Sequence, residues 1–143
     1  MKALSIIGYL VILAGLFGLY RVGSAFASKP LFVALQVAAV ALMIWARLTF
    51  GLRSFHPAAN PTAGGLVTSG PYRRVRHPIY SSICLFALAG LINRFSPLAL
   101  VFFTIVVAGA IIRLACEERL LRLTYPEYAQ YSNRTYRLVP GIF

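Results

Sequence analysis

The fold is decided by residues 97–121, which read PLALVFFTIVVAGAIIRLACEERLL. Residues 97–115 contain a single charge, Arg113, and the pair Glu117 and Glu118 follows directly. An apolar run of about 20 residues is long enough to cross a bilayer as an α-helix. Ionisable groups at such a depth are costly and tend to mark function. The stretch therefore predicts a membrane helix that ends in a polar site.

Three other apolar segments precede this one. They cover residues 3–20, 31–50 and 79–92, and we expect the third to run on to residue 95. The first is longer than the core of a signal peptide, about 7–15 residues, so we interpret it as a retained membrane helix. The prediction is an all-α integral membrane protein, a single domain over residues 1–143, with four transmembrane helices at about 3–20, 31–50, 79–95 and 97–115.

Composition and charge agree with a membrane protein. Hydrophobic residues make up 59% of the chain and charged residues 12%, against about a quarter charged in soluble domains. The net charge of +11 would suggest a nucleic-acid partner in a soluble protein. In so apolar a chain we assign it to the positive-inside rule and to anionic lipid, and we expect no nucleic acid. Two cysteines and two histidines without ligand spacing predict no metal site.

The basic residues are unevenly distributed along the chain. If the N-terminus lies inside, the outer loops hold only Arg21, Lys29 and Arg94, and the other basic residues lie on the inner side. This bias predicts that both termini are cytoplasmic, in the inner membrane if the source is a bacterium. Loop 51–78 and the C-terminal tail then share one compartment with all three acidic residues.

The C-terminal tail should be helical. The segment with the glutamates has no stop signal before Tyr125-Pro126, so its helix is expected to leave the membrane and continue as a stalk. A short helix after Pro126 would then carry Tyr128 and Tyr131.

Polar chemistry gathers on this inner side. Residues 70–80, GPYRRVRHPIY, place three arginines, a histidine and two tyrosines before the third apolar segment. Taken singly, the glutamate pair could be a solvated helix face paired with Arg113 and Arg122, His77 could be a helix cap, and the tyrosines could form an interfacial belt. Together, these groups suit a small molecule that is cationic, zwitterionic and aromatic.

Three blocks occur in order: GPYRRVRHPIY at 70–80, RLACEERLL at 113–121 and YPEYAQYSNRTYRLVP at 125–140. They resemble the C-terminal core of the isoprenylcysteine carboxyl methyltransferases, which phospholipid N-methyltransferases and bacterial relatives share. The resemblance covers about residues 60–143, and we recognise no motif in the first two helices. It departs at Ser82, where the family commonly has glycine, and at Tyr125-Pro126, where a Phe-Gly pair is common.

The resemblance implies S-adenosylmethionine as cofactor, in a cytosol-facing pocket formed by loop 51–78 and the C-terminal tail. The cofactor positions of the family fall on Tyr72, Arg76, His77, Pro78, Tyr80, Glu117, Tyr128 and Tyr131. Positions near the reacting centre fall on Arg113, which could orient the acceptor, and Glu118, which could hold Arg113 or the cofactor.

The implied reaction is methyl transfer at the cytosolic membrane face to a lipophilic acceptor, which we expect to enter from the bilayer between helices. The carboxylate of an isoprenylcysteine is the leading acceptor. Transfer to a phospholipid amine or a thiol stays open, and Glu118 or His77 would then have to take a proton. Membrane sterol reductases have a similar core that binds NADPH, but they are much longer. A non-enzymatic membrane scaffold would explain the helices but not the gathered polar groups.

Overall fold

The computed structural model describes residues 2–51 and 65–143, and all regular secondary structure in this part of the chain is helical. The elements are α1 (Lys2–Arg21), α2 (Pro30–Phe50), the 3-10 helix η2 (Gly70–Arg73), α3 (Pro78–Asn93), α4 (Pro97–Thr124) and α5 (Tyr128–Asn133). Proline occupies the first position of α2, α3 and α4, where its missing N–H costs no hydrogen bond.

Three of the helices, α1, α2 and α4, are long and apolar enough to cross a membrane. Helix α3 has 16 residues, which is about 24 Å at 1.5 Å per residue and short of a hydrocarbon core of about 30 Å. Within the described residues the chain thus has three candidate spans and one shorter apolar helix, in keeping with an integral membrane protein, where four transmembrane helices were expected.

Helix α3 ends at Asn93 and does not reach residue 95, because its end is tied to the turn before α2. The Asn93 side-chain oxygen accepts hydrogen bonds from the backbone N–H groups of Ser28 (3.2 Å) and Lys29 (3.0 Å). The Ser24 hydroxyl donates to the Arg94 carbonyl at 2.8 Å. These bonds stop the helix and fix the far end of the bundle.

The predicted helices of the C-terminal tail are confirmed. Helix α4 continues as one 28-residue helix to Thr124, and the short helix α5 carries Tyr128 and Tyr131.

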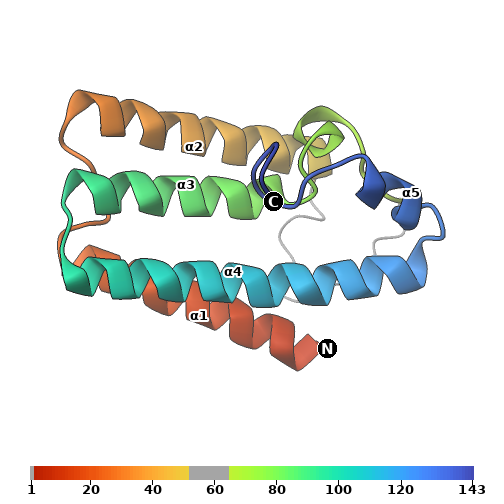
Figure 1. Cartoon of the computed structure of the whole chain (residues 1–143), viewed down its shortest axis with the longest axis horizontal. Helices are drawn as coiled ribbons and strands as arrows, with labels where there is room; N and C mark the ends of the chain where they lie inside the picture. Colours follow the sequence, from red (N-terminus) through yellow and green to blue (C-terminus); the bar gives the residue numbers. More distant parts are fainter. Residues whose placement is uncertain (1, 52–64) are drawn as a thin grey trace.

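The helices pack as two pairs. Helix α1 packs on α4 and α2 packs on α3, while α3 and α4 share a smaller interface (Figure 1). The turns at residues 22–29 and 94–96 lie at one end of the bundle. Both termini, α5 and the segment before α3 lie at the other end (Figure 1). All the motif blocks are therefore brought to one end.

Glycines allow the close approach of α1 and α4. A Cβ atom on Gly15 would lie 2.7 Å from Val106 Cγ2, and one on Gly109 would lie 2.8 Å from the Gly8 carbonyl oxygen. Small residues at such contacts are the usual means by which membrane helices associate.

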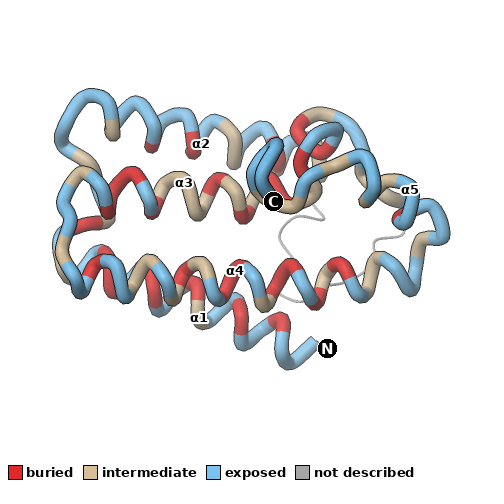
Figure 2. Tube along the Cα trace, viewed as in Figure 1, coloured by how far each residue is buried: buried red, intermediate tan, exposed pale blue. Residues whose placement is uncertain are grey.

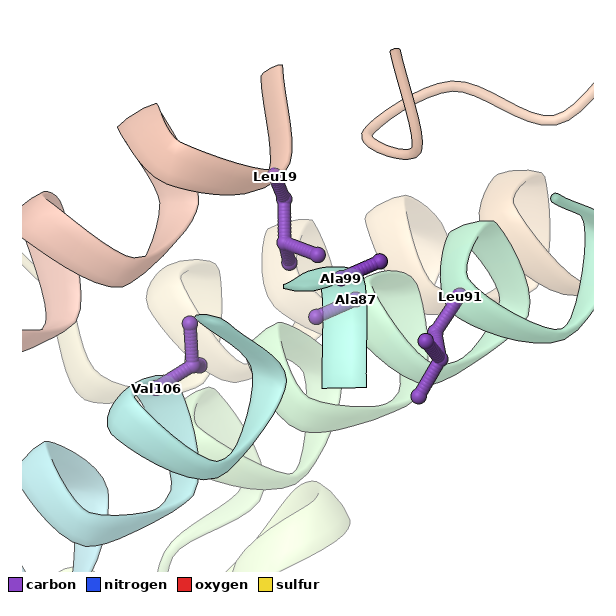
Figure 3. Packing of buried hydrophobic residues seen from close by; sticks show 5 residues of the cluster. All are labelled: Leu19, Ala87, Leu91, Ala99 and Val106. Carbon is purple, nitrogen blue, oxygen red and sulfur yellow. The ribbon is translucent and has the colours of Figure 1, made fainter. Parts of the chain in front are cut away.

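The apolar core joins α1, α3 and α4. Figure 3 shows Leu19, Ala87, Leu91, Ala99 and Val106 packed together between these helices. Helix α2 turns most of its surface outward (Figure 2), with only Gln36, Ala39 and Ala46 buried.

Candidate active site

The first and third motif blocks are joined by backbone hydrogen bonds. Val75 and Tyr136 form a parallel bridge. The Arg76 N–H donates to the Tyr136 carbonyl at 2.7 Å, and the His77 N–H donates to the Arg137 carbonyl at 3.1 Å. The C-terminal tail is thereby held against the start of α3, as the ribbon in Figure 1 shows. Of the loop predicted over 51–78, residues 52–64 lie outside the described part of the chain.

Arg76 connects this junction to α4 and α5. Its Nη1 donates to the carbonyls of Ser132 (2.6 Å) and Thr135 (2.5 Å), which satisfies acceptors at the end of α5. Its Nε donates to Glu118 Oε1 at 3.0 Å. The two side chains of this ion pair are only 9% and 6% exposed, so solvent screens it little.

Glu118 has further basic neighbours. Arg137 Nη2 lies 3.3 Å from Glu118 Oε2, and His77 Nε2 lies 3.5 Å from Glu118 Oε1. Arg137 belongs to the third motif block, where it follows Tyr131 by six positions, but the sequence alone assigned it no role. The motif spacing was the signal that could have identified it.

His77 lies between the two glutamates. Its Nδ1 is 3.5 Å from Glu117 Oε2, its Nε2 is equally far from Glu118, and its side chain is 4% exposed. Burial by itself lowers the pKa of His77, but the two carboxylates outweigh burial and leave that pKa raised. The imidazolium form is favoured. His77 occupies the N-cap position of α3, as the helix-cap interpretation expected, but its side chain makes no capping hydrogen bond and lies against the glutamates instead.

Arg113 and Tyr80 form the membrane-side half of the cluster. Arg113 Nε donates to the Tyr80 hydroxyl at 2.6 Å, and Arg113 Nη2 donates to Glu117 Oε1 at 3.2 Å. The Tyr80 hydroxyl in turn donates to the same Glu117 oxygen. The carboxylate that holds Arg113 is therefore Glu117, while Glu118 pairs with Arg76 and Arg137.

Three tyrosines form an aromatic group beside these charges. The rings of Tyr128 and Tyr131 meet edge to face with centroids 5.9 Å apart, and the Tyr131 hydroxyl donates to the Tyr72 carbonyl at 2.7 Å. Burial raises the pKa of Tyr131 to about 12, and it raises the pKa values of Tyr72 and Tyr128 as well. All three phenols are therefore protonated donors at neutral pH.

The Tyr128 hydroxyl is an unusual buried group. The residue is 0% exposed, and within the described part of the chain its hydroxyl has no hydrogen-bond partner. Leaving such a group unpaired costs about 1–3 kcal/mol. Buried polar atoms are hydrogen-bonded in the great majority of cases, so this hydroxyl is available to a bound water, ion or ligand.

The predicted residues thus come together in two adjoining groups. The charged cluster comprises Arg76, His77, Tyr80, Arg113, Glu117 and Glu118, to which the structure adds Arg137. The aromatic group comprises Tyr72, Tyr128 and Tyr131. Pro78 begins α3 and places His77 directly before the helix. The structure also brings Ser5 and Tyr9 of α1 to Arg113, for which no motif gave a signal.

Comparison with known proteins identifies the family of the chain. The sequence profile of the isoprenylcysteine carboxyl methyltransferase (ICMT) family matches residues 30–123. The match begins at α2, earlier than the expected start near residue 60, and it stops before the third motif block. Neither a curated protein nor a solved structure shows significant similarity to the chain. Because the profile match spans more than half of the chain and contains the first two motif blocks, the protein belongs to the isoprenylcysteine carboxyl methyltransferase family.

Proposed function

We propose that this membrane methyltransferase uses S-adenosylmethionine and methylates the carboxylate of a lipophilic acceptor of the isoprenylcysteine type. The observation that carries the proposal is the charged cluster, which is buried except at Glu117 and Arg137, whose side chains are 24% and 39% exposed. It gathers three arginines, two glutamates and His77 at one end of an apolar helix bundle. Three arginines against two glutamates leave one surplus positive charge even with His77 neutral. The cluster is therefore suited to an anionic group.

The side chains also match the chemistry of the proposed cofactor. When bound, S-adenosylmethionine would supply a methyl group already activated by the positively charged sulfur beside it. Arg76 and His77 can pair with its carboxylate, and Glu117 can accept from its hydroxyl or amino groups. The Tyr128 and Tyr131 rings can pack against its cationic and aromatic parts. The unpaired Tyr128 hydroxyl can donate to it.

The protonation states favour a carboxylate acceptor over an amine or a thiol. An amine or thiol must lose a proton during methylation, so the site would need a base. His77 is a poor base because the raised pKa keeps it in the imidazolium form. Glu118 is a poor base because Arg76 and Arg137 stabilise its charged form. A carboxylate needs no base, and Arg113, held by Tyr80 and Glu117, can orient it.

The site would face the cytosol. Both termini lie at its end of the bundle (Figure 1), and most basic residues belong to the same end, where they would also contact anionic lipid. Labelling of single cysteines, introduced at residue 2 or 143 of a cysteine-free variant, by a membrane-impermeant maleimide in intact cells and in inverted vesicles would test this orientation. Labelling in intact cells would refute it.

The reaction is tested by transfer of a tritiated methyl group from S-adenosylmethionine in detergent-purified protein. The acceptors are N-acetyl-S-farnesylcysteine, phosphatidylethanolamine and dodecanethiol. The proposal expects base-labile methyl ester on the farnesylcysteine. Label on the amine or thiol alone would refute the carboxylate assignment. Binding of NADPH without methyl transfer would indicate a reductase. Absence of both NADPH binding and methyl transfer would indicate a scaffold.

A further inference from the structure

One face of α1 is shaped around Arg113. Ser5, Gly8 and Tyr9 follow i, i+3, i+4 spacing and so lie on one side of the helix. The Ser5 carbonyl accepts from Arg113 Nη1 at 3.5 Å. A Cβ atom on Gly8 would lie 2.9 Å from Arg113 Cγ, so glycine makes room for the arginine stem. Helix α1 lies outside the family match at 30–123.

Tyr9 lies between Arg113 and the surroundings of the bundle. The Arg113 guanidinium carbon is 5.5 Å from the centroid of the Tyr9 ring and 5.8 Å from that of Tyr80. Tyr80 is 7% exposed, whereas Tyr9 is 41% exposed. Its neighbours on α1, Ile6 and Leu10, are exposed too. In a membrane helix this exposed apolar surface meets lipid chains.

Charge distinguishes Glu117 from Tyr9, both of which are partly exposed neighbours of Arg113. Glu117, whose side chain is 24% exposed, presents a negative charge that repels an approaching carboxylate. Tyr9 presents a neutral ring on a helix whose outer surface is apolar. A lipid that carries a carboxylate on a long apolar chain therefore meets less resistance at Tyr9.

We propose that the acceptor reaches Arg113 from the bilayer on the α1 side, and that Tyr9 is the positioning residue at this entrance. Its ring holds the guanidinium while the acceptor is absent and gives way to the carboxylate when the acceptor enters. The apolar chain of the acceptor then lies along Ile6 and Leu10. This inference rests on the proposed function, because it gives the entry route for the same acceptor.

The first test places a competing charge at the entrance. Tyr9→Glu should pair with Arg113 and raise KM for N-acetyl-S-farnesylcysteine at least about tenfold, while the Kd for S-adenosylmethionine stays within about twofold. Tyr9→Gln, which is similar in size but uncharged, should raise KM much less. Tyr20→Glu, the same substitution at the other end of α1, should leave KM unchanged. Equal KM values for Tyr9→Glu and Tyr20→Glu would overturn the proposal.

The second test does not depend on catalysis. A long-chain carboxylic acid with a diazirine near its carboxyl group is photolysed with the protein in nanodiscs, and the labelled peptides are mapped. We expect labelling concentrated on α1 around Tyr9 and reduced several-fold in Arg113→Gln, whereas the matching alcohol labels all lipid-facing surfaces. Labelling of α2 or α3 by the acid, or no difference from the alcohol, would overturn the entry route. If the wild type failed to bind S-adenosylmethionine, the proposed function would fail, and this labelling would still decide the route.

Discussion

Arg76→Gln should release the C-terminal tail from the site. The guanidinium donates to the Ser132 and Thr135 carbonyls at 2.6 and 2.5 Å and pairs with Glu118 at 3.0 Å. Both members of the ion pair are nearly buried. Removal of one partner from a buried pair costs about 3–5 kcal/mol. Glutamine is shorter and uncharged, so it cannot replace all three bonds.

We expect this cost to fall on local opening of the tail rather than on the whole bundle, because the backbone hydrogen bonds of Tyr136 and Arg137 join the tail to residues 74–77, next to Arg76. A loss of about 3–5 kcal/mol raises the opening equilibrium by roughly 10²- to 4 × 10³-fold, since each 1.4 kcal/mol is a factor of ten. Amide hydrogen exchange measures this opening directly. The reporters are the N–H groups of Tyr136, bonded to Arg74, and of His77, bonded to Arg137.

Arg134→Gln is the matched control, because Arg134 lies in the same tail with an exposed side chain. It should leave both exchange rates within about threefold of the wild type, as surface changes usually cost less than about 0.5 kcal/mol. If the Tyr136 and His77 amides exchange at the same rates in Arg76→Gln and Arg134→Gln, Arg76 does not hold the tail.

Two further predictions concern packing and pH. Gly109→Leu should lower the thermal unfolding midpoint in detergent by the equivalent of at least about 1–3 kcal/mol, because its side chain would meet the backbone of Gly8 and Ile12. Ala41→Leu on the exposed face of α2 should not, and equal midpoints for the two variants would contradict the tight α1–α4 contact. For His77, the folded-state pKa is raised above an unfolded value of about 6.5. Its stabilising contribution is therefore complete below pH 6.5 and is lost as pH rises through the folded pKa. The difference in free energy of unfolding between wild type and His77→Gln should shrink as pH rises. A difference that grows with pH would mean that folding lowers the pKa of His77 instead of raising it.

Much of the fold could be predicted from the sequence, because apolar length and proline positions are local signals. Pro30 and Pro97 do begin α2 and α4, and the run of α4 to Thr124 followed from the lack of a stop signal. The length of α3 could not be predicted. It is set by the side chain of Asn93, which bonds to a turn far away in the sequence.

The site was predictable in its members but not in its pairings. Arg113 and Glu117 are four residues apart and share a helix face, whereas Glu118, five residues on, points to a different side. Glu118 therefore pairs with Arg76 and Arg137 rather than with Arg113. The contribution of Tyr9 arises only when α1 packs on α4, and no local pattern encodes that contact.

Calorimetry on detergent-purified protein tests whether the charged cluster binds S-adenosylmethionine. We expect binding in the micromolar range, lost in His77→Ala and kept in Lys29→Ala at the opposite end of the bundle, with no heat from NADPH. Absence of binding by folded wild-type protein, or equal affinity in His77→Ala, would show that the charged cluster is not the cofactor site.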